Sequence, residues 1–152
     1  MGSPSVKIAD ALKNIRRLSV DTSPFIYYVE RYPAYVDKMR AVFLALEAGQ
    51  FEVITSTVTL TEVLTKPLRA GDSTLVKMYR EMLQTTRNVI LEPISVIIAE
   101  RAADLRARYS LKTPDALQVA TALHTGCDAF LSNDLGLKRV SELSILILDE
   151  LE

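Results

Sequence analysis

Short apolar runs alternate with longer segments of helical periodicity along most of this chain. The runs occupy residues 18–21, 51–56, 88–91, 129–133 and 144–148. They are continuously apolar instead of alternating with polar residues, which is typical of parallel strands that are covered on both faces. The pattern therefore predicts five strands of one buried parallel sheet.

The segments between these runs have apolar residues three or four positions apart, as in helices with one buried face. Four such stripes are Tyr35, Met39, Val42, Phe43 and Leu46; Leu75, Met78, Tyr79 and Met82; Ile94, Ile98, Ala102, Leu105 and Tyr109; and Ala116, Val119, Ala120 and Leu123. Residues 57–66 predict a shorter helix that stops near Pro67. Strands that alternate with helices form right-handed βαβ units. The predicted fold class is α/β, a three-layer α/β/α sandwich with a mostly parallel open sheet of about five strands.

An additional segment precedes the first strand. Its apolar residues Ile8, Ala11, Leu12 and Ile15 have helical spacing, and Ser3 or Ser5 is the expected N-cap. We expect residues 1–17 to form an N-terminal helical extension that docks on the sheet or on a second subunit. Residues 18–152 are expected to form one domain.

Composition restricts the chemistry. A chain of 152 residues with 49% hydrophobic residues can bury a single core. One cysteine, Cys127, and one histidine, His124, leave no intrachain disulfide and no multi-thiolate or paired-histidine zinc site. The net charge of −1 excludes a protein that binds polyanions over its whole surface. We also expect no membrane span and no signal peptide, and therefore a cytoplasmic location.

Four acidic residues stand at the ends of predicted elements. Asp21 closes the first strand and Asp134 follows the fourth, while Glu62 and Asp115 are expected in the first turns of helices that start from the same edge of the sheet. Ligands of open parallel sheets bind outside the carboxyl ends of the strands, where the strand order reverses. The four carboxylates are therefore expected to converge on one rim.

Each of these acids also has an ordinary local interpretation. Asp21 suits a helix cap, Glu62 suits an ion pair with Lys66, Asp115 suits the helix dipole, and Asp134 suits an Asx turn. Their joint placement favours a shared site. Two unit charges 4 Å apart repel by about 4 kcal/mol at an effective dielectric near 20, so a cluster of carboxylates needs cations. Oxygen ligands alone select Mg²⁺ or Mn²⁺.

Four segments carry a resemblance to a known family. In order they are "SVDTSPFIYYVE", "VITSTVTLTEVL", "TPDALQVATAL" and "FLSNDLGLKRV". Together they resemble a PIN domain, close to the VapC-type toxin ribonucleases, over about residues 18–150. The resemblance implies that residues 18–152 form a PIN-like nuclease domain which cleaves single-stranded RNA by metal-dependent phosphodiester hydrolysis. It also implies an antitoxin protein as a partner.

The resemblance also implies roles for particular residues. Asp21, Glu62, Asp115 and Asp134 fall on the acidic positions of the family and would be both catalytic residues and metal ligands. Ser132 stands where a serine or threonine supports the site by hydrogen bonding. With Mg²⁺ or Mn²⁺ activating water, no protein nucleophile is needed. His124 is expected far from the site, near the other end of its helix.

Other features leave alternatives open. Lys112 is the basic residue best placed to contact a substrate phosphate, because it neighbours Asp115. The tyrosines at positions 27, 28, 32 and 35 could stack on bases, although packing in the core or in a dimer is favoured. With the additional helix they predict a homodimer. A non-catalytic PIN-like module that binds RNA or protein remains the alternative function.

Overall fold

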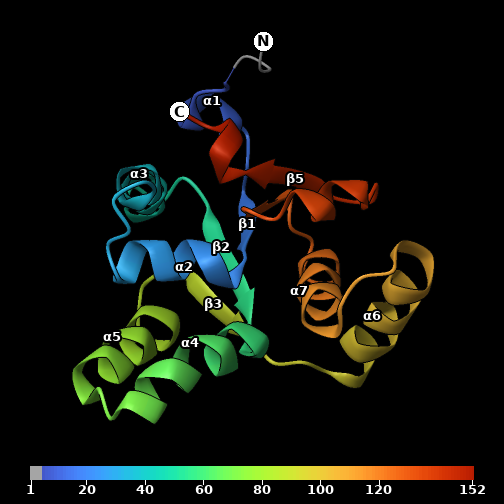
Figure 1. Cartoon of the computed structure of the whole chain (residues 1–152). Coiled ribbons are helices and arrows are strands. Elements are labelled where there is room, and N and C mark those ends of the chain that lie inside the picture. The colour runs from blue at the N-terminus through green and yellow to red at the C-terminus, as the bar shows by residue number, and fades with distance from the viewer. Residues whose placement is uncertain (1–4) are drawn as a thin grey trace.

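A five-stranded, all-parallel sheet forms the centre of the computed structural model, which describes residues 5–152 (Figure 1). The strand order is β3-β2-β1-β4-β5. The strands are β1 (Arg17–Val20), β2 (Glu52–Ser56), β3 (Val89–Glu92), β4 (Ala129–Ser132) and β5 (Ser144–Ile147). Each apolar run of the sequence lies within one residue of its strand, and the α/β fold class is confirmed.

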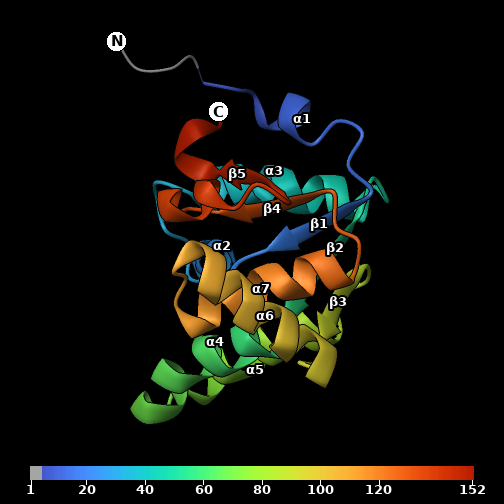
Figure 2. The same cartoon turned by 90° about the vertical axis from the view of Figure 1, so that its right-hand side faces the viewer.

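Helices cover both faces of this sheet. They are α1 (Ile8–Ala11), α2 (Thr22–Val29), α3 (Val36–Glu47), α4 (Thr57–Ala70), α5 (Ser73–Gln84), α6 (Val96–Tyr109) and α7 (Thr113–His124), with two 3₁₀ helices, η1 (Leu135–Arg139) and η2 (Leu148–Glu150). Figures 1 and 2 show α2 and α3 on one side of the sheet and α6 and α7 on the other. No helix within residues 5–152 is long and apolar enough to cross a membrane.

Alternation along β4 explains why the sheet needs two covering layers. Ala129 and Leu131 belong to the core cluster formed with α2, α3 and α5, whereas Phe130 belongs to the cluster formed with α6 and α7. Successive side chains of a strand point to opposite faces. Both faces of the strand are therefore buried, which is why its sequence is apolar without interruption.

Helix α4 is longer than the sequence predicted. It passes through Pro67 and ends at Gly71, whose φ of 69° is left-handed and suits glycine. A proline inside a helix costs about 3 kcal/mol because it lacks an N–H and its ring meets the preceding turn. Pro67 is buried, so tertiary packing outweighs that local cost. The predicted stop near Pro67 was wrong.

Helix α5 packs against the core with most of its predicted stripe, since Tyr79 is buried and Leu75 and Met82 are partly buried against the same core cluster. Val76, Tyr79 and Leu83 are its buried residues, while Met78 is 45% exposed. The prediction was therefore wrong for Met78, and it missed Val76 and Leu83. Apolar residues occur on more than one side of this segment, and only the position of the sheet decides which side is buried.

Within residues 5–17 the N-terminal extension contains one helical turn, α1. Its N-cap is Lys7, so the expected cap at Ser5 was wrong, and Ser3 lies outside the described residues. Ile8 is buried in the core of its own chain, next to α3. The backbone of Val6 and Ile8 bonds to the C-terminal segment, with Ile8 N–H donating to the Glu152 carbonyl at 2.9 Å. The extension thus docks on its own subunit.

Candidate functional site

The sheet has a topological switch point between β1 and β4. From β1 the chain moves outward through β2 to β3 and then returns to β4 on the other side of β1. Val20 pairs with Leu131 at the ends of these two strands, and Asp21 N–H donates to the Leu131 carbonyl at 2.9 Å. Ligands of such sheets bind in the crevice beyond this point. Asp21 and Asp134, which follow the two strands, flank it.

Asp21 is the N-cap of α2 and also the acid nearest to the centre of the switch point. Its Oδ1 accepts from Thr22 N–H at 2.8 Å, and its Oδ2 accepts from the Ser132 hydroxyl at 2.8 Å. Burial raises the pKa of the carboxyl from 3.8 to about 6; the two hydrogen bonds oppose this rise, and the charges of Asp115 and Glu62 add to it. The capping role and membership of an acidic site therefore coexist.

Ser132 links the ends of β1 and β4. It is fully buried, donates to Asp21, and accepts from Asp134 N–H at 3.1 Å. Asp134 is exposed, and its Oδ1 accepts from Gly136 N–H at 2.9 Å, so the Asx-turn interpretation of this residue also holds. Ser132 thus bonds to the carboxylate of Asp21 and to the backbone of Asp134, and its supporting role in a site stays a prediction.

Glu62 lies in the second turn of α4, because the helix begins at Thr57; its predicted place in the first turn was wrong. The side chain is exposed, and within residues 5–152 no ion pair joins it to Lys66. Instead, its Oε1 accepts from the Thr22 hydroxyl at 2.7 Å. This contact connects α4 to the residue that follows Asp21.

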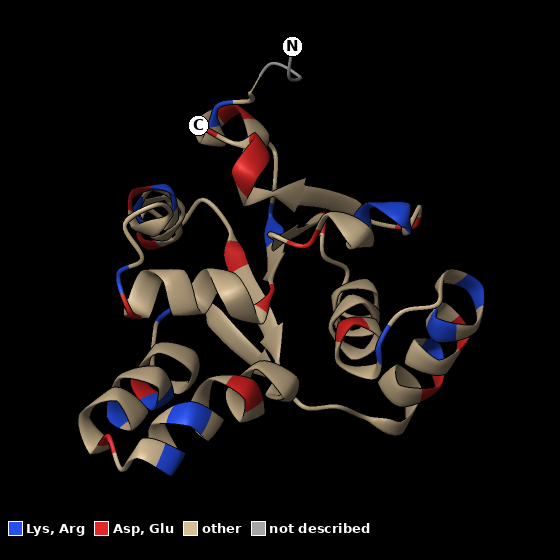
Figure 3. Ribbon diagram, in the orientation of Figure 1, with Lys and Arg blue, Asp and Glu red and all other residues tan. Residues whose placement is uncertain are grey.

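Asp115 is half-buried in the first turn of α7. Partial burial raises the pKa of its carboxyl, the charges of Asp134 and Glu62 raise it further, and those of Lys112 and Arg139 lower it. The acids therefore act on one another across the switch point. We call Asp21, Glu62, Asp115 and Asp134 the acidic rim. Figure 3 shows acidic segments on α4 and α7, and basic segments along α6 and its connection to α7.

The donor chemistry of the acidic rim fits Mg²⁺ or Mn²⁺, since every candidate ligand is a carboxylate oxygen. As the side chains stand, no three acidic, histidine or cysteine residues of the described chain are close enough together to hold one ion. Magnesium ions in proteins keep several waters and commonly use one or two carboxylates. An ion held here would therefore take one or two carboxylates as direct ligands and water for the rest.

Sequence reasoning missed the polar side chains beneath the rim. Thr22, Ser56, Thr59 and Gln118 are all buried and hydrogen-bonded to one another or to the rim. The sequence carried only a weak signal for this network. Gln118 is a large amide in a mostly apolar helix, most of whose surface is expected to be buried. Buried polar groups need partners, so such a residue predicts a buried network without identifying its members.

Basic residues stand on the α7 side of the rim. Lys112 is the N-cap of α7 and is exposed, with no ion pair in the described part of the chain. Arg139 donates to the Ser110 carbonyl at 3.3 Å, which brings η1 next to the connection that carries Lys112. Lys138, in contrast, pairs with Glu150 at 2.5 Å. Lys112 and Arg139 are therefore the cations most available to an anionic ligand here.

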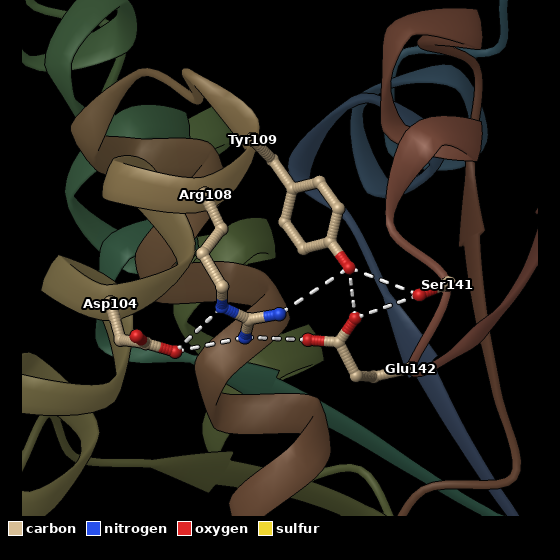
Figure 4. Close-up of polar contacts among 5 residues, drawn as sticks. All are labelled: Asp104, Arg108, Tyr109, Ser141 and Glu142. Atoms are coloured by element: carbon tan, nitrogen blue, oxygen red, sulfur yellow. Dashed lines mark hydrogen bonds and ion pairs between the residues drawn. The ribbon is translucent and has the colours of Figure 1, made fainter.

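A polar cluster fastens this basic region to the sheet (Figure 4). Arg108 of α6 bridges Asp104 at 2.8 Å and Glu142, in the loop before β5, at 2.7 Å. Tyr109 donates to Glu142 as well, and Ser141 completes the cluster. These hydrogen bonds lower the pKa of Glu142 to about 2, the bond from Tyr109 contributing most. The end of α6, just before Lys112, is thereby held in place.

The tyrosine-rich segment packs mainly within the fold. Tyr27 stacks on Tyr35 with ring centroids 4.2 Å apart, and Tyr28 contacts Phe43 at 4.3 Å. Only Tyr32 among these tyrosines is largely exposed. The geometry favours the packing interpretation over base stacking. His124 is the exposed last residue of α7, at the opposite end of the helix from Asp115, as predicted.

Comparisons with known proteins agree with this architecture. Residues 18–143 match the family model described as "PIN domain". A toxin–antitoxin complex from Klebsiella pneumoniae contains a chain that is 25% identical, with a TM-score of 0.62; the match covers 86% of this chain and 97% of that one. No curated protein matches.

Two further structures share the fold at lower identity. VapC20 of Mycobacterium tuberculosis, a toxin that cleaves the sarcin-ricin loop, is 19% identical with a TM-score of 0.67, covering 82% of this chain and 95% of that one. VapBC2 from Rickettsia felis, bound to a DNA fragment from its promoter, is 14% identical with a TM-score of 0.65, covering 86% of this chain and 98% of that one.

Proposed function

The chain belongs to the PIN domain family, and on this premise we propose that it is a metal-dependent endoribonuclease that cleaves single-stranded RNA by phosphodiester hydrolysis. The observation that carries the proposal is the acidic rim. Four carboxylates from four parts of the chain lie around the switch point of the sheet, and the pKa of Asp21 and that of Asp115 are both raised there. Burial is the main cause of both rises and the neighbouring carboxylates add to it, so a bound cation would offset both costs.

Asp21, Glu62, Asp115 and Asp134 would hold Mg²⁺ or Mn²⁺. Bound there, the ion would supply Lewis-acid chemistry, lowering the pKa of water and stabilising the negative charge that develops on a phosphate during hydrolysis. The protein itself would orient the carboxylates that bind the ion. Ser132 and Thr22 N–H fix the two oxygens of Asp21, so this carboxylate is oriented before any ligand arrives.

Lys112 and Arg139 would bind the phosphate backbone of the RNA on the α7 side. Both lie close enough to Asp115 to lower its pKa, and neither is taken up by an ion pair within residues 5–152. Contacts of this kind position a strand without reading its sequence. On this side the protein would therefore recognise the phosphate backbone, and other contacts would select the bases.

We also propose a small antitoxin as a protein partner, by analogy with the toxin–antitoxin complexes among the structural relatives. A groove of about 290 Å³ lies between α2 and α4 and is lined by Ile26, Tyr32, Val63 and, at its edge, Glu62. An amphipathic segment could place its apolar side there and bring a basic residue to the acidic rim. The cytoplasmic location expected from the sequence stays a prediction.

The spacing of the rim acids favours one alternative, a non-catalytic module that binds RNA or protein, because no three of them are close enough to share an ion directly. Incubation with a mixed pool of single-stranded RNA separates the two functions. The nuclease predicts cleavage with Mg²⁺ or Mn²⁺, none with chelator, and none from Asp115→Asn. Retention of RNA without any cleaved ends, with either metal, would favour the binding module.

A further inference from the structure

A chain of buried hydroxyl and amide groups lies beneath the acidic rim and ends on Glu62. Thr55 Oγ1 donates to Thr59 Oγ1 at 2.8 Å, and the hydroxyls of Thr59 and Thr22 are 3.1 Å apart. Gln118 Nε2 donates to Thr59 at 2.6 Å and to Thr22 at 3.2 Å. The Thr22 hydroxyl then donates to Glu62 Oε1 at 2.7 Å. Four elements thus contribute to a single network.

The hydrogen bonds of this network run in one direction. A hydroxyl has one proton and two acceptor lone pairs. Thr59 Oγ1 accepts from both Thr55 and Gln118, so its own proton is free for Thr22. Thr22 accepts from Thr59 and Gln118, and its proton goes to Glu62. Every donor in the chain therefore points toward the carboxylate.

The orientation of the Gln118 amide sets this direction. Ser56 Oγ donates to Gln118 Oε1 at 2.7 Å and itself accepts from Val58 N–H at 3.1 Å, as the N-cap of α4. The amide oxygen thus faces Ser56, and the amide nitrogen faces the threonines. Within residues 5–152 no buried side-chain nitrogen or oxygen lacks a partner, so the network is complete with the amide in this orientation.

We infer that Gln118 is a positioning residue that holds the Glu62 carboxylate toward the acidic rim. It acts through the buried threonines, which commit the Thr22 proton to Glu62. Glu62 is exposed, and Thr22 is the one side chain of the described residues that bonds to it. Without that bond the carboxylate would sample several rotamers in solvent. The inference rests on the proposed function in that it takes Glu62 as a member of the site.

Three substitutions in the network test the inference. Thr22→Val removes the donor while keeping the shape of the side chain, and Thr22→Ser restores a hydroxyl. Gln118→Glu replaces an amide donor by an acceptor, so the protons of the two threonines turn toward position 118 and away from Glu62. Thr121→Val is the matched control. It removes a buried hydroxyl of α7 that donates to the Leu117 carbonyl at 2.8 Å and lies outside the network.

Two measurements are made on each protein. Calorimetric titration gives the dissociation constant for Mn²⁺, and ¹³C relaxation of the Glu62 side chain in the metal-free protein reports its order. Loss of a partner that orients a metal ligand typically weakens metal binding by about 10–100-fold. We expect that loss, with a more mobile Glu62, for Thr22→Val and Gln118→Glu. Thr22→Ser and Thr121→Val should stay close to wild type in both measurements.

Wild-type Mn²⁺ affinity and an ordered Glu62 in Thr22→Val would overturn the inference. So would an equal loss in Thr121→Val, which would reveal a general effect of losing a buried hydroxyl. Should Thr22→Val fail to fold, the same two measurements on Gln118→Glu decide. If wild type binds no Mn²⁺ and cleaves no RNA, the proposed function fails, while the relaxation of Glu62 still decides whether the network holds it.

Discussion

Asp21→Asn tests directly whether the fold keeps a carboxylate where its ionisation is costly. The pKa of Asp21 rises from 3.8 to about 6, chiefly because burial disfavours the charged form. In the unfolded chain the same group ionises near its ordinary pKa. Asparagine carries no charge at any pH, so the substitution removes this cost while keeping the size of the side chain.

The sign and size of the effect follow from linkage. Between pH 3.8 and about 6 the folded protein keeps a proton on Asp21 that the unfolded chain has lost, so the stability of wild type falls as the pH rises. Each pH unit between the two pKa values contributes about 1.4 kcal/mol. Relative to Asp21→Asn, metal-free wild type should therefore lose about 2–3 kcal/mol of its free energy of unfolding between pH 4 and pH 7.

Urea unfolding with chelator, followed by circular dichroism across this pH range, measures the effect. The quantity of interest is the free energy of unfolding of Asp21→Asn minus that of wild type at each pH. Groups that titrate alike in both proteins cancel in this difference, whereas pH-independent changes in the hydrogen bonds to Ser132 and Thr22 shift it by the same amount at every pH. Asp10→Asn, an exposed acid of α1, is the control for removing a charge far from the site.

A difference that stays constant from pH 4 to pH 7 would refute the reasoning, because Asp21 would then be as well solvated in the folded protein as in the unfolded chain. A difference that changes in the opposite direction would mean that hydrogen bonds to the ionised form outweigh burial. In either case the fold would not hold Asp21 where its ionisation is costly, and the proposal would lose the reason for a compensating cation.

Further outcomes are expected at other positions. Asp115→Asn removes a repelling charge, so the metal-free variant should melt at the same or a higher temperature than wild type. Mn²⁺ should raise its melting temperature little, and it should cleave no RNA. Full activity of the variant would show that Asp115 only stabilises its helix. Ser132→Ala leaves Asp21 without one donor and should lower the cleavage rate by about 10–100-fold, measured as kcat/KM; an unchanged rate would contradict its supporting role. Light scattering should give twice the chain mass of 16.9 kDa for the predicted homodimer, whereas a monomer at micromolar concentrations would refute it. Purification from the native host should recover a small antitoxin, and repeated recovery of the protein alone would favour a stand-alone nuclease.

Much of this fold could be predicted from the sequence because the signals are local. A parallel strand buried on both faces must be apolar throughout, so the five runs located the strands within one residue. The positions of Asp21 and Asp134 follow from the same signal, since a residue just after a strand lies at the carboxyl edge of the sheet. The resemblance of four segments to the PIN domain family added a function that spacing alone does not imply.

Features that depend on which elements pack together were decided only by the tertiary structure. Pro67 continues a helix because its ring is buried, and α5 turns Val76 inward and Met78 outward because of where the sheet lies. The network from Gln118 to Glu62 joins residues up to 96 positions apart in the chain, as in the bond from Gln118 to Thr22. No local pattern specifies such a bond. A hydrogen bond needs two atoms within about 3 Å, and only the packing of four elements brings these atoms together.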